Sequence, residues 1–402
     1  MSKAWNLVDA ASHGSPRRQQ IGPLELLVLQ GTPFCNLDCS YCYLPDRDDR
    51  RKMDLAVAEK AVEWVLEANL VEHEFTVVWH AGEPLVLGVD YYEQAIERIR
   101  HLVPAEIEVN HSIQSNGVLI NERWCDFFKR RNIRLGLSVD GPAEIHNAFR
   151  RTRDGKGTHA KLSQKIELLS EQQVAFHVIA VLTGRSIRDP ERMFEYFSGL
   201  DIDYLCFNLE EIEAANPEST LLKQDCYRDY VDFLERFFEL RQQYRPGLQI
   251  REIDGAINSI ANWRATAQHE SVRPQENTPF KILNVDVEGN FSTFSPELLG
   301  DEHPRYGDFR LGNLSSTSLE DCLSDPHYQR IAADIADGVN RCRGECDYFD
   351  LCGGGSPSNK LAENGRLDSG ETAFCRLQRK ACVDAALDIL EKNLGICAEG
   401  QR

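Results

Sequence analysis

The first half of the chain alternates between short apolar runs and longer stretches with helical periodicity. Apolar runs predict buried strands at residues 24–30, 75–80, 107–114, 133–139, 174–182 and 202–209. Helical patterns fill the intervals, at about 54–69, 90–102, 121–131, 158–170 and 190–198. This alternation predicts an α/β fold with a parallel sheet and helices outside it. The pattern alone allows a barrel or an open doubly wound sheet.

The pattern changes after residue 209. Glu210-Glu-Ile-Glu213 interrupts it, a helix is expected from about Ser219 to Tyr244, and the segment to about 278 is expected to connect two functional parts. Arg251, Glu252 and Asp254 lie in that segment. They receive no catalytic role, because charged residues on a connecting helix generally form a solvated face.

The last part of the chain has shorter elements. A hairpin is predicted at 282–295, turning at 288–290, and a helix is predicted from about Ser318. We therefore expect four parts: a flexible lead-in (1–20), a strand–helix core (21–215), a bridge (216–280) and a C-terminal domain (281–402).

Composition narrows the class of protein. The chain has 402 residues with 42% hydrophobic residues, enough for a packed interior. A net charge of −19 argues against a general nucleic-acid or lipid-surface binder. With no membrane-length apolar run and no signal-like start, a cytoplasmic location is expected. Thirteen cysteines in such a chain indicate metal ligands and buried thiols rather than disulfides.

Three of these cysteines follow the first predicted strand directly. Cys35, Cys39 and Cys42 form a C-x3-C-x2-C group between Gly31 and Tyr43. Three thiolates are one too few for a closed tetrahedral zinc site or a fully ligated [4Fe–4S] cluster. They would leave one iron open to a small molecule. The plainer alternative is three unrelated buried or metal-stapling cysteines.

A second cysteine group lies near the C-terminus. Its spacing is C-x3-C-x5-C followed by a distant fourth thiol, formed by Cys342, Cys346, Cys352 and Cys375. Four thiols suit one closed iron–sulfur cluster, and zinc would satisfy the spacing too. Cys382 is a spare candidate ligand. The other cysteines are expected to be buried thiols, namely Cys125, Cys206, Cys226, Cys322 and Cys397.

Polar turns end three of the predicted strands, where the chemistry of barrel-like α/β proteins gathers. The turns are His80-Ala-Gly-Glu-Pro84, Gln114-Ser-Asn-Gly117 and Ser138-Val-Asp-Gly-Pro142, the last followed by Arg150. Taken one at a time, they read as simple strand-to-helix turns. Arg150 also begins a short basic run, so a solvated patch is its plainer reading.

Together with the first cysteine group, these turns resemble the radical S-adenosylmethionine (SAM) superfamily. The resemblance implies a partial (β/α)6 barrel and a [4Fe–4S] cluster whose open iron binds the amino and carboxylate groups of SAM. It implies SAM contacts from residues of the cysteine loop and strand ends, namely Tyr41, Gly82, Glu83, Asn116, Ser138 and Arg150. Ala81 departs from the family's G-G-E-P pattern.

The C-terminal cysteines resemble the SPASM domain of peptide-modifying radical SAM enzymes. That domain implies an auxiliary [4Fe–4S] cluster. The chain departs from it after the hairpin glycine, where Phe291-Ser-Thr-Phe-Ser-Pro-Glu297 lacks the frequent cysteine. Two clusters in all are therefore expected.

The narrowest resemblance is to the GrrM/OscB group of cyclophane-forming peptide maturases. It rests on residues 29–45, 294–298 and 353–360. It implies a ribosomal precursor peptide as partner, an electron donor such as flavodoxin or ferredoxin, and a C–C crosslink between an aromatic ring and a nearby β-carbon. One alternative is formylglycine formation, as in anaerobic sulfatase maturases. Another is a non-catalytic zinc-binding adaptor.

Overall fold

A computed structural model describes residues 21–223, 225–265 and 272–394. The expected lead-in at 1–20 and the expected buried thiol Cys397 lie outside these residues.

Six parallel strands form the first part of the sheet, at the predicted places. They are β1 (Leu26–Leu29), β2 (Glu74–Trp79), β3 (Glu108–Ser115), β4 (Arg134–Ser138), β5 (Phe176–Leu182) and β6 (Tyr204–Leu209). The helices between them are α1 (Leu55–Glu67), α2 (Val89–Leu102), α3 (Glu122–Arg131), α4 (Ala143–Phe149), α5 (His159–Glu171) and α6 (Pro190–Ser198). Short 3-10 turns η1 (Pro84–Leu87) and η2 (Ser186–Arg188) follow β2 and β5. Asp54 caps α1 through its side chain, as the sequence predicts.

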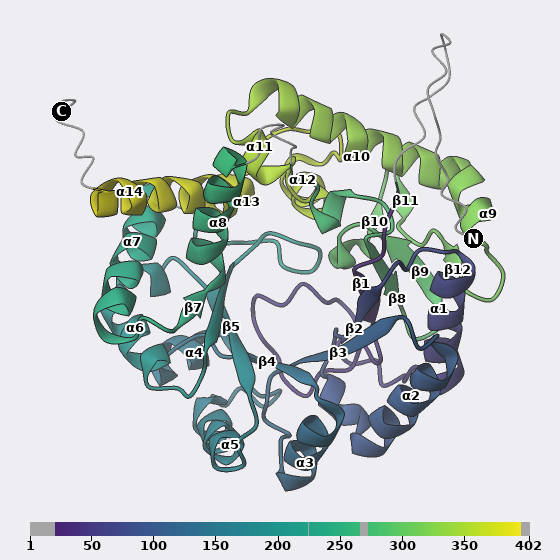
Figure 1. The fold of residues 1–402 in the computed structure, drawn as a ribbon, viewed down its shortest axis with the longest axis horizontal. Helices are drawn as coiled ribbons and strands as arrows, with labels where there is room; N and C mark the ends of the chain where they lie inside the picture. The colour runs from purple at the N-terminus through teal and green to yellow at the C-terminus, as the bar shows by residue number, and fades with distance from the viewer. Residues whose placement is uncertain (1–20, 224, 266–271, 395–402) are drawn as a thin grey trace.

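The strand order identifies a barrel-like sheet. β1 to β6 are neighbours in chain order, whereas a doubly wound sheet reverses its order at a switch point. The curved sheet with its outer helices forms the ring seen in Figure 1. Its two ends do not pair with each other among the described residues. The fold is a partial (β/α)6 barrel, as expected.

The sheet continues beyond the barrel on both sides. Next to β6 lies β7 (Gln249–Ile250). Next to β1 lies β8 (Ile282–Val285), which pairs with β1 in parallel and turns into β9 (Asn290–Thr293). β12 (Gly312–Asn313) completes the ten-stranded sheet. One sheet thus contains strands from the core, the bridge and the C-terminal domain as the sequence analysis divided them.

Among its described residues, the bridge contains the α-helices α7 (Tyr227–Tyr244) and α8 (Arg251–Ala265). The prediction that the first one starts at Ser219 is wrong. Ser219 Oγ donates a hydrogen bond to Glu210 O across 2.6 Å, and the Thr220 N–H donates to the Glu210 carboxylate across 2.6 Å. These local bonds satisfy polar groups in a turn instead of a helix.

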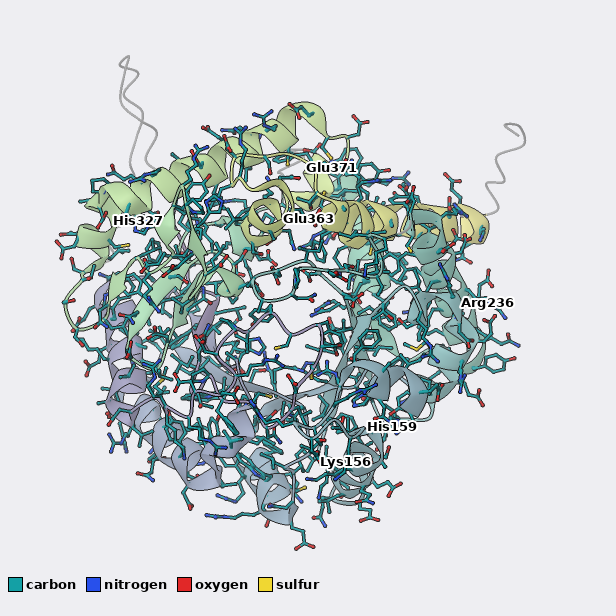
Figure 2. All side chains as sticks on the ribbon, turned by 180° about the vertical axis from the view of Figure 1, so that it is seen from behind. Lys156, His159, Arg236, His327, Glu363 and Glu371 are labelled. Carbon is teal, nitrogen blue, oxygen red and sulfur yellow. The ribbon has the colours of Figure 1, made fainter. Side chains whose placement is uncertain are left out.

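Helices of the C-terminal part lie along one side of the barrel ring (Figure 1). They are α9 (Leu319–Ser324), α10 (Pro326–Glu345), α11 (Phe349–Cys352), α12 (Pro357–Asn364), α13 (Ala373–Cys375), the π-helix η5 (Arg376–Ala381) and α14 (Cys382–Leu394). Shorter elements are η3 (Gln275–Asn277), η4 (Pro296–Leu298), β10 (Glu302–His303) and β11 (Gly307–Asp308). Side chains fill the space between these layers (Figure 2). No described helix has the length and apolarity needed to cross a lipid bilayer.

Candidate functional site

The first cysteine group lies in the loop between β1 and α1. Backbone hydrogen bonds connect this loop to the end of α4 and the residues after it. The Asp38 N–H donates to Arg151 O across 2.8 Å, and the Ser40 N–H donates to Phe149 O across 3.1 Å. Arg153 Nε donates to Cys35 O across 2.8 Å. The loop that carries the three half-buried thiols is therefore positioned by a distant part of the barrel.

The turn after β2 touches the same loop through its backbone. Gly82 has φ +57°, and a Cβ atom there would lie 2.4 Å from Thr32 O and 2.5 Å from Phe34 O. Only glycine fits this close approach. Its neighbour Ala81 also has a positive φ, +69°, which an L side chain rarely adopts. The departure from the family pattern at Ala81 thus keeps the backbone path but strains it.

Glu83 joins the ends of β2 and β3. Its buried carboxylate accepts hydrogen bonds from Ser115 Oγ across 2.7 Å, the Asn116 N–H across 2.9 Å and the Leu85 N–H across 3.0 Å. Burial raises the pKa of Glu83, and these three hydrogen bonds oppose the shift. Asn116 Nδ2 in turn lies 3.9 Å from Cys35 Sγ. The predicted SAM contacts Glu83 and Asn116 are thereby brought beside the cysteine loop.

Asp140 connects three parts of the barrel. Its carboxylate accepts hydrogen bonds from Tyr41 Oη across 2.5 Å, from Arg150 Nε across 2.9 Å and from the Val181 N–H of β5 across 3.0 Å. Arg150 is 8% exposed, so the solvated-patch reading does not hold for it. Ser138, at the end of β4, accepts a hydrogen bond from Gln114 Nε2 across 3.1 Å.

Sequence reasoning assigned Tyr41, Ser138 and Arg150 to this region but gave Asp140 no role. The signal was present: an aspartate directly after a buried strand, ten positions before an arginine. The contact between this carboxylate and Tyr41 could not be predicted, because it depends on how the cysteine loop folds back to the end of β4.

The thiols of the first group suit a positively charged inorganic partner. Burial raises the pKa of Cys35 to about 12 and that of Cys39 to about 11. They become thiolate ligands only when a metal centre compensates the charge. Across the described residues, no three His, Cys, Asp or Glu side chains are arranged to hold a single metal ion. A cluster, in which each thiolate binds a different iron, fits this arrangement better than one ion does.

The C-terminal cysteines come together in one cavity. Cys342, Cys346, Cys352 and Cys375 all line a cavity of about 210 Å³ between α10, α11, α12 and α13. Lys360 and Lys380 line it too. Four thiols with nearby cations suit an anionic [4Fe–4S] centre.

The chain matches the family model described as the radical SAM superfamily over residues 29–197. It is 40% identical to the protein sll1766 of Synechocystis sp., covering 93% of this chain and 94% of the relative. It is 30% identical to the serine-type anaerobic sulfatase-maturating enzyme of Klebsiella aerogenes, covering 88% and 84%. The chain belongs to the radical SAM superfamily. It is thus an enzyme, and the zinc-adaptor alternative is wrong.

Solved structures share its fold. AnSMEcpe with bound AdoMet and the Cp18Cys peptide is 23% identical with a TM-score of 0.72, covering 93% of this chain and 99% of that one. SuiB of Streptococcus suis bound to the precursor peptide SuiA is 14% identical with a TM-score of 0.61, covering 88% and 76%. As a member of the radical SAM superfamily, the enzyme uses SAM and a [4Fe–4S] cluster that binds SAM.

The remaining cysteines of the radical SAM enzyme lie elsewhere. Cys382 does not line the four-thiol cavity, and its Sγ lies 3.9 Å from Tyr230 Oη. Four others are buried, as predicted: Cys125, Cys206, Cys226 and Cys322. In the hairpin, Phe291 and Phe294 are buried where the SPASM resemblance would lead one to expect a cysteine. The ring centroids of Phe291 and Trp64 lie 5.0 Å apart.

A larger cavity of about 560 Å³ lies at the gap of the open barrel. It is lined from β1 and β8 on one side, from β6 and α8 on the other, and from the C-terminal helices, including Cys352 and Cys375. Five glutamates line it. Glu252 and Glu276 pair with Arg251 and Arg379, and the other three are Glu211, Glu213 and Glu297. The described residues place no Lys or Arg within ion-pair distance of any of the three.

The environment of these three carboxyl groups raises their pKa values. Burial raises the pKa of Glu297 to about 7 and, together with Glu297, raises that of Glu211 to about 8. Burial and the other two carboxyl groups raise the pKa of Glu213 well above its usual range. Burial and the same carboxyl groups raise the pKa of Tyr43, the residue after Cys42. The cavity reaches Cys352 and Cys375 of the second cysteine group. The loop that carries Glu211 and Glu213 contacts the first cysteine loop, because the Ala215 N–H donates to Tyr43 O across 3.1 Å.

Sequence reasoning missed this cavity. The Glu210–Glu213 segment was noted only as a break in the strand–helix pattern, and Glu297 only as part of a resemblance. Glu297 comes near Glu211 and Glu213 only because η4 of the C-terminal part lies against the loop after β6.

Proposed function

We propose that this enzyme modifies a ribosomally made precursor peptide by forming a C–C crosslink between an aromatic ring and the β-carbon of a nearby side chain. A peptide substrate is supported by relatives that mature sulfatases and by structural neighbours that bind peptides. The observation that carries the proposal is the cavity at the barrel gap. It is lined by Cys352 and Cys375 of the second cysteine group and by glutamates of the loop that contacts the first group. Its volume of about 560 Å³ suits side chains of a bound peptide.

We assign the cofactors to the two cysteine groups. Cys35, Cys39 and Cys42 hold the SAM-binding cluster, and Cys342, Cys346, Cys352 and Cys375 hold the auxiliary cluster. Tyr41, Gly82, Glu83, Asn116, Ser138 and Arg150 surround SAM. The hydrogen bonds of Asp140 and Glu83 keep Tyr41, Arg150 and Asn116 in place before SAM binds, which lowers the cost of ordering the site.

When bound, the cofactors supply a 5′-deoxyadenosyl radical that takes one hydrogen atom from the peptide, and an auxiliary cluster that takes one electron. Forming the C–C bond removes a second hydrogen from the aromatic ring, so one proton must also leave. We assign its acceptance to the carboxyl group of Glu211, Glu213 or Glu297, which face the cavity. A carboxyl group with a pKa near neutrality suits a general base. The peptide thereby loses two hydrogens in total.

Formylglycine formation is the second candidate. It is favoured by the identity to sulfatase-maturating enzymes over most of the chain. The hairpin around Phe291 argues for the crosslink instead. An aromatic ring is packed there, where the SPASM resemblance implies a cysteine ligand of a further cluster.

The test is a reaction of the anaerobically purified enzyme with SAM, a reductant such as flavodoxin or ferredoxin, and either of two peptides. One peptide comes from a short reading frame next to the gene, and the other carries a sulfatase serine or cysteine site. The crosslink would be supported by a peptide product that has lost two hydrogens and does not react with an aldehyde reagent. In tandem mass spectrometry, this product should give no fragments from cleavage between the two joined residues. Formation of an aldehyde on the sulfatase peptide would contradict the crosslinking proposal and support formylglycine formation.

A further inference from the structure

Lys360 is a buried cation whose nitrogen points at a cysteine. It lies on α12 in the Gly353–Lys360 segment, and it is only 3% exposed. Its Nζ donates a hydrogen bond to Cys342 Sγ across 3.4 Å. Gly338 of α10 leaves room for the ammonium group, since a Cβ there would lie 3.1 Å from Lys360 Nζ. The lysine is thus built into the wall of the four-thiol cavity.

The charge of Lys360 is not matched by a carboxylate. The described residues contain no Asp or Glu within ion-pair distance of its Nζ. Lys380, the other lysine of the cavity, differs: it is paired with Glu371 and is more exposed. Figure 2 shows Glu371 on the C-terminal part of the molecule. A buried ammonium group is costly unless an anion lies beside it. The anion that this position offers is the sulfur of Cys342 and whatever centre that sulfur binds.

We propose that Lys360 raises the reduction potential of the auxiliary cluster, acting through Cys342 as a positioning and tuning residue. The inference rests on the assignment of the cluster to the four C-terminal cysteines, made above. Reduction adds one negative charge to the cluster, and a fixed positive charge at hydrogen-bond distance from a ligand sulfur stabilises that added charge. Hydrogen bonds to ligand sulfurs act in the same direction. Lys360 would therefore make the cluster a better acceptor of the electron that leaves the peptide.

The test is a redox titration followed by EPR. It uses the Cys35→Ala/Cys39→Ala/Cys42→Ala chain, in which the auxiliary cluster is the one that remains, so that the readout depends on neither SAM nor a peptide. Lys360→Met removes the charge with little change of length, Lys360→Gln replaces it with a neutral donor, and Lys360→Arg keeps it. Lys380→Met is the matched control, because Glu371 already balances that charge.

We expect the equilibrium constant for cluster reduction to fall about tenfold in Lys360→Met, which is a drop of 59 mV for a one-electron couple. Lys360→Gln should fall in the same direction, and Lys360→Arg and Lys380→Met should stay near the parent chain.

An unchanged potential in Lys360→Met, or an equal drop in Lys380→Met, would overturn the proposal. Loss of iron from both neutral variants would also overturn it, because the lysine would then be needed to build the site rather than to tune it. A parent chain without iron would refute the ligand assignment itself. A failure of the crosslinking proposal would leave the potentials unaffected, so the two failures can be told apart.

Discussion

Tyr41 donates a hydrogen bond to Asp140 across 2.5 Å, and this contact joins the cysteine loop to the end of β4. Asp140 also holds the buried Arg150. The cysteine loop and the predicted SAM contacts Tyr41 and Arg150 are therefore one connected unit. Its geometry depends on Asp140, a residue outside both cysteine groups.

Replacing Asp140 should damage the fold more than its size suggests. In Asp140→Asn, the guanidinium of Arg150 remains buried without its anionic partner. We expect the free energy of unfolding to fall by about 3–5 kcal/mol, measured by anaerobic urea unfolding. Tyr41→Phe removes one hydrogen bond to a charged group and should cost about 1.5–3 kcal/mol.

Asp38→Asn is the matched control for that series. Asp38 lies in the same loop and pairs with Arg47 across 2.9 Å, but its side chain is 59% exposed. Exposed pairs contribute at most about 1 kcal/mol. Equal effects of Asp38→Asn and Asp140→Asn would show that burial of the Asp140–Arg150 pair is unimportant.

The adjacent residues Ala81 and Gly82 should respond in opposite ways. Gly82→Ala would drive a Cβ atom against Thr32 O and Phe34 O, and so displace the cysteine loop. We expect this variant to lose about four irons of about eight, the number in two [4Fe–4S] clusters. Ala81→Gly relieves a positive φ and should keep all of them. Iron and sulfide analysis would decide, and a Gly82→Ala enzyme with full iron content would refute the argument.

The strands, the helices and both cysteine groups could be predicted from the chain because each signal is local. Periodicity marks β1 to β6, and spacing marks the thiols. The meeting of Asp140 with Tyr41, and of Glu297 with Glu211, could not be predicted, because each pair joins segments that only the folded sheet brings together. The start of α7 was misplaced for a related reason: Ser219 and Thr220 bond to Glu210, and periodicity does not register such competing side-chain bonds.

The cavity carboxyl groups should make stability fall as the pH rises. The pKa values of Glu297 and Glu211 in the folded chain, about 7 and about 8, lie above the unfolded value of about 4.3. Between these values the folded state binds more protons than the unfolded state, so stability is fully present below about pH 4 and declines toward pH 8. The melting temperature should therefore decrease less between pH 5 and pH 8 in Glu297→Gln than in wild type. The exposed Glu320→Gln is the control, and identical slopes in all three proteins would contradict the prediction.

Product formation should need the ionised form of the same carboxyl groups. With wild type, we expect the rate of peptide modification to increase as the pH passes from about 7 to about 8. In Glu211→Gln/Glu213→Gln/Glu297→Gln the rate should fall by about 10²–10⁴-fold, while 5′-deoxyadenosine still forms. Chromatography of the nucleoside and mass spectrometry of the peptide measure the two separately. If the rates of peptide modification and of 5′-deoxyadenosine formation fell together, the carboxyl groups would act in a step before proton removal.

The pairing of β1 with β8 also bears on how the molecule is made. β1 is among the first elements to leave the ribosome, yet its outer edge has no partner until the segment 282–285 follows. An unpaired, apolar strand edge invites association with other chains. A fragment that ends before β8, such as the core 21–215 alone, would therefore be expected to aggregate. The first strand of the sheet thus depends for its protection on a segment that is synthesised more than 250 residues later.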